Sequence, residues 1–366
     1  MERRHFLRYL GIGAASAGIS ACGQESSTAA ASCEEKNQAK FEWKMVTTWP
    51  KNFPGLGTGA EFLAQQINEM SNGRLTVKVY GAGEIVPAFE SFDAVVGGTA
   101  EMGHGSAYYW KGKNPAFQFF STVPFGMTAN EMNAWLYHGG GMELWQRAYE
   151  PFGLEPMPAG NTGVQMGGWF NKEINSLDDL RGLKMRIPGL GGEVLRLAGG
   201  TPVNVPGGDL FMSLKNGVID ATEWVGPYND LAFGLHDAAK YYYSPGWHEP
   251  GTTLECIVNK EAMAQLPADL QSIVRNAARV TNANMMLEYV AKNNDALDVL
   301  INRHGVEVRS FPDDVIEKLR ELSAQVVAEV AGNDAFSQEI YDSYLNFSNK
   351  SKAWYRLSEQ AYLNLR

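Results

Sequence analysis

The sequence predicts an α/β protein of two lobes, with crossing strands at a hinge between them and long carboxyl-terminal helices. Strand-type and helical patterns alternate from Phe41 onward, which is typical of a sheet covered by helices. Near Leu154 the chain becomes glycine-rich and extended, and after Ala262 it is almost wholly helical. At 366 residues, 45% of them hydrophobic, the chain is long enough for two cores.

The first residues have the pattern of an export signal. The pair Arg3-Arg4 precedes a weakly apolar stretch that ends at Ser20, as in a twin-arginine signal. This stretch is shorter than the roughly 20 strongly apolar residues of a transmembrane helix. It runs through small residues into Cys22, which resembles a lipoprotein box. We therefore expect residues 1–22 to be a twin-arginine, lipoprotein-type signal to the periplasm, with Cys22 as the candidate lipid anchor.

Residues 23–40 lack apolar periodicity and are expected to form a flexible tether, so that folding begins near Phe41. Cys33 lies in this tether and Cys256 in the body, which leaves no pair of body cysteines for a disulfide. No closely spaced cysteines or histidines indicate a zinc or iron–sulfur site.

The charge of the chain restricts its partners. The formal net charge is −10, and the first 21 residues hold three arginines and one glutamate, so the remainder carries −12. This acidic balance argues against nucleic acid or an anionic membrane as a partner. An anionic ligand would need a local cationic site.

Residues 41–160 are predicted to form lobe I. The expected elements are strands at 41–49, 74–80 and 101–107 and helices at 59–70 and 87–96. This βαβ order predicts a parallel sheet covered by helices. The ligands of such sheets bind beyond the carboxyl ends of the strands.

Residues 161–250 are predicted to form lobe II, with short strands at 184–187 and 202–205 and a helix at 209–216. A crossing strand and a helix returning across the lobes are expected at 251–312, and further helices at 313–366. The last of these carries an apolar stripe from Phe336 to Trp354. Either a partner subunit or the chain's own lobes could cover it.

Arg186 ends a strand-type run just before a Pro-Gly break. An arginine at that position can present its planar fork to a carboxylate, although a solvated surface role stays open from spacing alone. Glu223 and Glu249 lie among aromatic residues, where carboxylates are costly unless they are paired or bind a metal ion. Two carboxylates, one arginine and a monoanionic ligand leave a deficit of positive charge. A hard cation held by these acids, the amide of Gln165 and backbone carbonyls would correct it, unless the acids are unrelated surface residues.

Enzyme signatures are poor. Gly103-His104-Gly105-Ser106 is not a nucleophile elbow, and the six histidines are scattered, so each is expected to have a satisfied or surface role. An exported, cofactor-bearing oxidoreductase stays an alternative because the twin-arginine route would suit it. A structural lipoprotein is a further alternative.

Three segments resemble the periplasmic receptors of TRAP (tripartite ATP-independent periplasmic) transporters. They are Leu183–Gly189 (LKMRIPG), Leu214–Glu223 (LKNGVIDATE) and the helix beginning at Leu266-Pro267. The resemblance covers about residues 41–350. Segments 161–170 (NTGVQMGGWF) and 223–228 (EWVGPY) are similar to the branch that binds α-keto acids such as pyruvate. Receptors for 2-hydroxy acids such as lactate, or for polyols such as mannitol, look similar.

The resemblance implies roles for individual residues. Arg186 would bind the ligand carboxylate and Gln165 would contact ligand and ion, while Tyr109 and Asn161 are further ligand-binding candidates. Glu223, the Trp224 carbonyl and Glu249 would coordinate the cation. That cation is sodium in the α-keto-acid branch and calcium in a lactate-binding relative; electrostatics favour calcium and the branch favours sodium, which we expect.

The resemblance also implies partners. The chain would deliver a small monocarboxylate to a TRAP membrane permease without catalysing a reaction, and it would form a homodimer through a swapped carboxyl-terminal helix.

Overall fold

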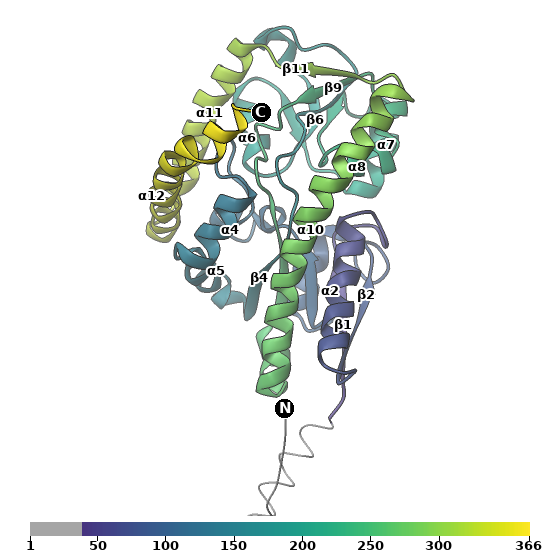
Figure 1. Cartoon of the computed structure of the whole chain (residues 1–366), viewed down its shortest axis with the longest axis vertical. Coiled ribbons are helices and arrows are strands. Elements are labelled where there is room, and N and C mark those ends of the chain that lie inside the picture. The colour runs from purple at the N-terminus through teal and green to yellow at the C-terminus, as the bar shows by residue number, and fades with distance from the viewer. Residues whose placement is uncertain (1–38) are drawn as a thin grey trace, which may run out of the picture. The chain divides into compact units, whose positions relative to one another are not determined.

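The computed structural model describes residues 39–366, so the predicted export signal, Cys22 and nearly all of the tether lie outside the described residues. Contacts between Cα atoms divide the chain into Met1–Ala39 and Lys40–Arg366. Only the second unit is described below, and it contains two sheets flanked by helices, as the sequence predicts (Figure 1). Within the described residues, no helix has the length and apolar character needed to cross a membrane.

The first sheet has the strand order β2-β1-β3-β10-β4. Its strands are β1 (Phe41–Thr47), β2 (Leu75–Tyr80), β3 (Met102–Gly105), β4 (Leu154–Asn161) and β10 (Thr253–Asn259). β1 is parallel to β2 and β3, whereas β10 is antiparallel to β3 and to β4. The strands of residues 41–160 therefore run in one direction, as predicted, and the sheet is mixed only because β10 is added to it. β10 returns from the second sheet and inserts between β3 and β4, so it runs against both.

Helices cover this sheet. They are α2 (Leu56–Met70), η1 (Ala88–Glu90), α3 (Ser91–Val96), η2 (Ala107–Trp110), η3 (Pro115–Phe120), α4 (Ala129–His138), α5 (Gly141–Tyr149), η4 (Glu150–Phe152) and α9 (Lys260–Gln265). α2 buries Ala60, Leu63 and Ile67, whose spacing of three and four places them on one face. The helix begins three residues earlier than its apolar pattern predicts.

The second sheet has the strand order β11-β9-β5-β8-β6-β7. Its strands are β5 (Gly168–Phe170), β6 (Lys184–Arg186), β7 (Thr201–Val203), β8 (Ala221–Thr222), β9 (Tyr241–Ser244) and β11 (Glu307–Ser310). Its helices are η5 (Leu177–Leu180), α6 (Gly189–Leu197), η6 (Gly207–Asp209), α7 (Leu210–Lys215), α8 (Pro227–Ala232) and η7 (Leu235–Asp237). Trp169 on β5 stacks on Tyr242 of β9 with ring centroids 4.1 Å apart, which fixes the centre of this sheet.

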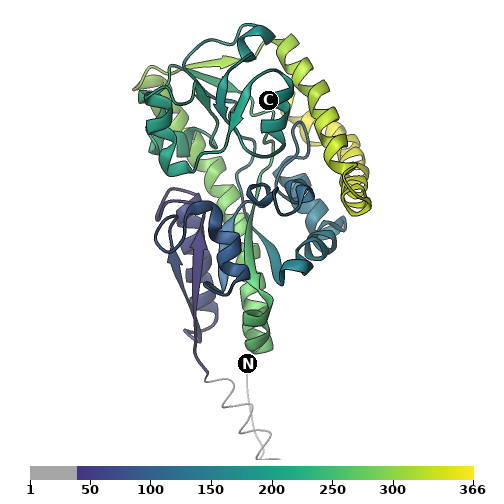
Figure 2. The same ribbon diagram turned by 180° about the vertical axis from the view of Figure 1, so that it is seen from behind.

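Long helices complete the fold. They are α10 (Ala268–Asn302), α11 (Asp313–Ala331), α12 (Ala335–Leu357) and α13 (Glu359–Leu363). α10 runs past both sheets, in contact with α2 and β4 of the first lobe and α8 of the second (Figure 2). The last of the helices expected within 313–366 breaks at Ser358, where φ is −108° and ψ is −96°.

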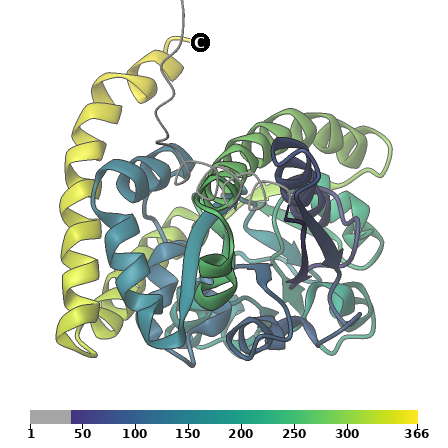
Figure 3. The same ribbon diagram turned by 90° about the horizontal axis from the view of Figure 1, so that it is seen from below.

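The apolar stripe of α12 is covered in its first half by its own chain. α12 lies along α4 and α5 (Figure 3), and Ile340 and Tyr344 are buried there. The Tyr344 hydroxyl accepts a hydrogen bond from the Met127 amide at 2.8 Å. Trp354 and Leu357, in contrast, are 65% and 80% exposed. Only the end of the stripe therefore lacks cover from its own chain.

Two extended segments link the sheets, one between β4 and β5 and the other between β9 and β10. They run side by side: the Thr162 amide donates to the Thr252 carbonyl (3.1 Å), the Gln165 amide to the Glu249 carbonyl (3.1 Å), and the Gly246 amide to the Gln165 carbonyl (2.8 Å). We call this pair the hinge segments. Because they are the shortest links between the lobes, their side chains lie where both lobes meet.

A buried carboxyl lies in β10, where this strand leaves the hinge. Glu255 is 1% exposed and accepts hydrogen bonds from Trp110 Nε1 and from the Tyr149 hydroxyl. Burial raises the pKa of Glu255 from 4.5 to about 7, and the two hydrogen bonds only partly oppose it. The carboxyl therefore binds its proton more tightly in the folded protein than in the unfolded chain.

This pKa predicts how stability depends on pH. As pH rises from about 4.5 to 7, the unfolded chain loses the proton and the folded protein keeps it, so the free energy of unfolding falls. A shift of this size corresponds to about 3 kcal/mol, fully lost above pH 7. Urea unfolding of the wild type and of Glu255→Gln at pH 4 to 8 measures it. Relative to Glu255→Gln, the free energy of unfolding of the wild type should fall as pH rises. The exposed control Glu143→Gln should show no such trend relative to the wild type. A pH-independent difference between the wild type and Glu255→Gln would contradict the assignment.

Candidate functional site

Arg186 is the last residue of β6 and is 1% exposed, so the alternative of a solvated surface arginine is wrong. Its guanidinium forms an ion pair with Glu223, donates from Nε to the Val205 carbonyl (3.2 Å), and donates from Nη2 to the Tyr109 hydroxyl (3.2 Å). Burial lowers the pKa of Arg186, but the Glu223 carboxylate together with Tyr109, Tyr108 and Glu249 more than offsets this, and the pKa is raised overall. The group therefore stays a fixed cation between the lobes.

Tyr109 and Trp224 pack against this cation from opposite lobes. Tyr109 lies in η2 of the first lobe, and burial raises the pKa of its hydroxyl, which therefore stays protonated. The Trp224 ring lies 5.0 Å from the Arg186 guanidinium carbon, a cation–π contact. Arg186 is thus held on one side by a carboxylate and on another by an aromatic face, in surroundings that favour a flat carboxylate partner.

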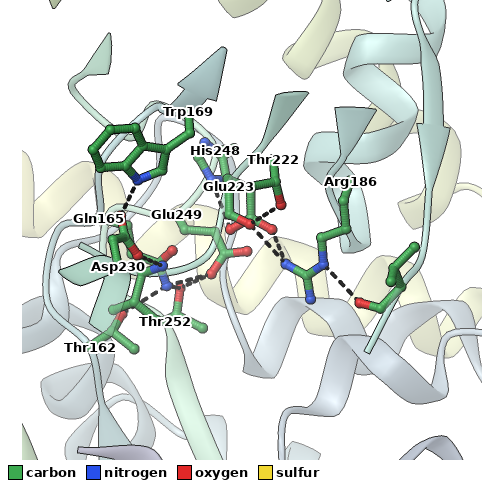
Figure 4. A network of polar contacts seen from close by, with 12 residues as sticks. Thr162, Gln165, Trp169, Arg186, Thr222, Glu223, Asp230, His248, Glu249 and Thr252 are labelled. Carbon is green, nitrogen blue, oxygen red and sulfur yellow. Dashed lines mark hydrogen bonds and ion pairs between the residues drawn. The ribbon is translucent and has the colours of Figure 1, made fainter. Parts of the chain in front are cut away.

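Three titratable side chains converge beside Arg186. Glu223 follows β8, and His248 and Glu249 lie in the second hinge segment; one ligand atom of each falls within 4.8 Å of the others (Figure 4). All three are at most 2% exposed. His248 Nε2 lies 3.5 Å from Glu223 Oε2, and neither ring nitrogen of His248 has a hydrogen-bond partner in the described part of the chain.

His248 was not among the sequence-predicted site residues. Its expected satisfied or surface role does not fit a buried ring with two unpartnered nitrogens. The only signal in the sequence was its position next to Glu249 in a Trp-His-Glu-Pro run. Nothing in that run shows that Glu223, 25 residues earlier, would face it.

Gln165 joins the two hinge segments through its side chain. Its Nε2 donates to Glu249 Oε2 at 2.8 Å and to the Thr162 hydroxyl at 3.1 Å, and the Thr252 hydroxyl donates to the same Glu249 oxygen at 2.6 Å (Figure 4). Gln165 Oε1 and Glu223 Oε2 are buried and accept no hydrogen bond from any described residue. These two oxygens point to a missing positive partner.

The donor set fits a hard cation. Two carboxylates, an amide oxygen and nearby backbone carbonyls are the ligands that sodium and calcium prefer. Burial and the charge of Glu223 raise the pKa of Glu249 well above its usual range, which shows how poorly the site tolerates two carboxylates alone. The residues present therefore fit the cation that the sequence predicts, with Glu223, Glu249 and Gln165 as its side-chain ligands.

Asn161 lies at the end of β4 and is fully buried. Its Nδ2 donates to the Gly251 carbonyl (3.3 Å) and its Oδ1 accepts from the Gly163 amide (2.9 Å). Both the nitrogen and the oxygen of the Asn161 side chain thus bind backbone atoms of the hinge segments. Gly163 has the positive φ of 70° that this turn requires. The structure gives Asn161 a role in shaping the hinge, and its expected contact with ligand stays a prediction.

A small cavity opens beside these residues. Tyr109, Gln165 and Trp224 line it, together with Trp49, Leu56, Tyr108, Thr162, Val225, Thr252 and Leu254. Its volume is ≈ 10 Å³, which is room for about one water molecule. A small organic anion would enter only as the lobes or the lining side chains move apart. The walls are largely aromatic and aliphatic and include the polar side chains of Thr162, Gln165 and Thr252, as in a site for a short amphiphilic molecule.

Comparison with known proteins identifies the family to which this chain belongs. The model of the DctP family, "Bacterial extracellular solute-binding protein, family 7", matches residues 45–334. The monocarboxylate 2-oxoacid-binding periplasmic protein of Nostoc sp. (strain PCC 7120) is 41% identical over 364 residues, which cover 100% of this chain and 98% of that protein.

Solved structures of TRAP solute-binding proteins are similar to this chain in sequence and fold. A TRAP periplasmic solute-binding protein from Pseudoalteromonas atlantica T6c with bound sodium and pyruvate is 44% identical, with a TM-score of 0.87 over 89% of this chain and 99% of that chain. One from Colwellia psychrerythraea with calcium and pyruvate is 45% identical, with the same TM-score over 89% and 100%. A mixed-occupancy dimer from Bordetella bronchiseptica RB50, with calcium and picolinate at its active site, is 36% identical, also at 0.87 over 89% and 97%. This chain therefore belongs to the DctP family of extracellular solute-binding proteins, the solute receptors of TRAP transporters.

Proposed function

We propose that this protein binds a small 2-oxo monocarboxylate, pyruvate or a close homologue, together with a cation, and delivers it to a TRAP membrane permease. The observation that carries the proposal is the buried, permanently charged Arg186, which lies between two lobes and beside two buried acids, Glu223 and Glu249. The relatives that bind pyruvate with sodium or calcium support it. Its chemistry is binding and release, with no bond made or broken.

Arg186 supplies the recognition of the carboxylate. Its Nη2 now donates to the Tyr109 hydroxyl, and a ligand carboxylate would take this position and accept from both groups. The Trp224 ring would pack against the flat 2-oxo acid. A polyol such as mannitol is disfavoured, because it has no planar carboxylate to accept paired hydrogen bonds from the guanidinium.

Closure of the lobes converts binding into a signal. Tyr109 belongs to the first lobe and Arg186 to the second, so a ligand touches both only when the lobes meet. The ligand thereby favours the closed state, which the permease would recognise. Lactate and other 2-hydroxy acids carry the same carboxylate, and their affinity relative to pyruvate is an outcome of the binding tests below.

The cation is assigned as sodium, with calcium as the alternative. Glu223, Glu249 and Gln165 would hold it with the Trp224 carbonyl, and the relatives contain one ion or the other. When bound, it supplies the positive charge that lets two carboxylates and an anionic ligand share one buried site.

Export by the twin-arginine route to the periplasm, with a lipid anchor at Cys22, completes the proposal. The family is extracellular by its description, which supports export. An anchored receptor would stay close to the permease that it serves.

We also propose a homodimer formed through the end of α12 and α13. Trp354, Leu357 and Leu363 there are 65%, 80% and 57% exposed, and neighbouring exposed apolar side chains of this kind mark interaction surfaces. The dimer reported for the Bordetella relative supports this.

Arg186→Met should weaken pyruvate binding more than 100-fold, because a charge-assisted, bidentate contact is lost. Isothermal titration calorimetry measures the loss. Arg186→Lys keeps the charge opposite Glu223, and its affinity for pyruvate should still fall at least tenfold. Because this variant keeps the buried ion pair, it separates a recognition defect from a folding defect. Arg181, whose side chain is 76% exposed, gives the control Arg181→Met. Unchanged affinity in Arg186→Lys would overturn the assignment of Arg186.

Glu249→Gln should weaken cation binding at least tenfold, because one of two anionic ligands is removed. Titration with sodium or calcium in a potassium buffer measures this, with exposed Glu261→Gln as the matched control. The raised pKa of Glu249 means that protons compete with the cation, so wild-type affinity should fall as pH falls. The variant should lose part of this pH dependence. Equal affinity of both proteins would show that the cation binds elsewhere.

Replacing both Trp354 and Leu357 by alanine should shift the protein from dimer to monomer in sedimentation velocity, because the exposed apolar contact is removed. Val218→Ala, at a 63% exposed position far along the chain, is the control. A monomeric wild type at micromolar concentration would rule out the dimer.

A further inference from the structure

A hydrogen-bonded chain connects the wall of the ligand cavity to the hinge. Trp49, which lines the cavity, donates from Nε1 to His104 Nδ1 at 2.8 Å. His104 Nε2 lies 3.1 Å from the Ala159 carbonyl oxygen. His104 is 1% exposed and Trp49 is 2% exposed, so water does not compete for either contact.

The two partners fix the state of the imidazole. An indole N–H can only donate, so Nδ1 must be unprotonated; a carbonyl can only accept, so Nε2 must carry the hydrogen. An imidazolium would lose the bond from Trp49. Burial lowers the pKa of His104 to about 4, which agrees with a neutral ring held in one tautomer.

The position of His104 in the sheet determines which strands these hydrogen bonds connect. His104 lies on β3, with β10 between it and β4, and it pairs with Cys256 of β10. Ala159 lies on β4, two residues before Asn161 and the first hinge segment. The imidazole thus links Trp49, after β1, to a strand on the other side of β10.

Trp49 faces the other cavity residues with its ring. Its centroid is 6.2 Å from that of Tyr109 and 6.3 Å from that of Trp224. It therefore contacts one residue of each lobe, and both of these residues also contact Arg186. Arg186 thus lies next to the cavity, and a ligand whose carboxylate binds Arg186 would have its carbon chain among the cavity walls to which this indole belongs.

We propose that His104 is a positioning residue that locks the Trp49 indole as a fixed wall and thereby limits the length of the acid that the closed site accepts. This rests on the proposed function. A longer 2-oxo acid needs the indole to move, and movement breaks a buried hydrogen bond that nothing else can replace. Selectivity for the shortest acids then depends on a residue that does not line the cavity.

The test compares two variants. His104→Leu removes both contacts, whereas His104→Asn places Oδ1 where Nδ1 was and still accepts from Trp49. Calorimetry with pyruvate and with 2-oxovalerate gives the ratio of their dissociation constants. The wild type should prefer pyruvate; His104→Leu should reduce that preference at least fivefold, and His104→Asn should stay within twofold of the wild type. In a Trp49→Phe background, which has no indole donor, His104→Leu should change the ratio no further.

A readout without ligand separates this proposal from the proposed function. In ¹⁵N-labelled protein, the Trp49 indole resonance, identified by its absence in Trp49→Phe, should exchange slowly with solvent. It should shift and exchange faster in His104→Leu but not in His104→Asn. A wild type that binds no 2-oxo acid refutes the proposed function while this measurement still tests the lock. Either of two results would show that His104 acts only on stability. One is a Trp49 indole resonance that is unchanged in His104→Leu, and the other is a lower melting temperature of His104→Leu with an unchanged ratio of the two dissociation constants.

Discussion

The structure depends on a permanent positive charge buried between two lobes. Arg186 cannot lose its proton, and removing a guanidinium from water is costly unless carboxylates and further acceptors surround it. Glu223, the Val205 carbonyl and the Tyr109 hydroxyl provide those partners. Because Tyr109 comes from the other lobe, the electrostatic requirement of one side chain also couples the lobes. The same requirement brings Glu249 and Gln165 of the hinge segments close to the charge.

The excess of negative charge is the reason for a cation. Glu223 and Glu249 outnumber Arg186, and the buried oxygens of Gln165 and Glu223 accept no hydrogen bond from the described residues. An anionic ligand would add to this excess, so ligand and cation would stabilise each other's binding. The hydrogen-bonded hinge segments hold Gln165 and Glu249, the proposed cation ligands, side by side.

The aromatic residues define the apolar part of the cavity. Trp49 contacts both Tyr109 and Trp224 beside it, and His104 accepts a hydrogen bond from the Trp49 indole. Rigid rings confine a small ligand better than flexible aliphatic side chains do. Tyr109 and Trp224 also contact Arg186, so the rings that would confine the carbon chain lie next to the charge that would bind the carboxylate.

The sequence by itself determined local properties: the βαβ start of lobe I, the long helix that follows Leu266-Pro267, and Arg186 at a strand end before Pro-Gly. Resemblance of motifs added the roles of Gln165, Glu223 and Glu249. Only the tertiary structure decided that β10 inserts antiparallel between β3 and β4, that α12 covers half of its stripe itself, and that His248 and His104 face the site and its wall. Periodicity and spacing report a residue's neighbours within a turn or a strand. Strand insertion and the burial of a histidine depend on segments more than fifty or a hundred residues apart, whose meeting no local pattern encodes.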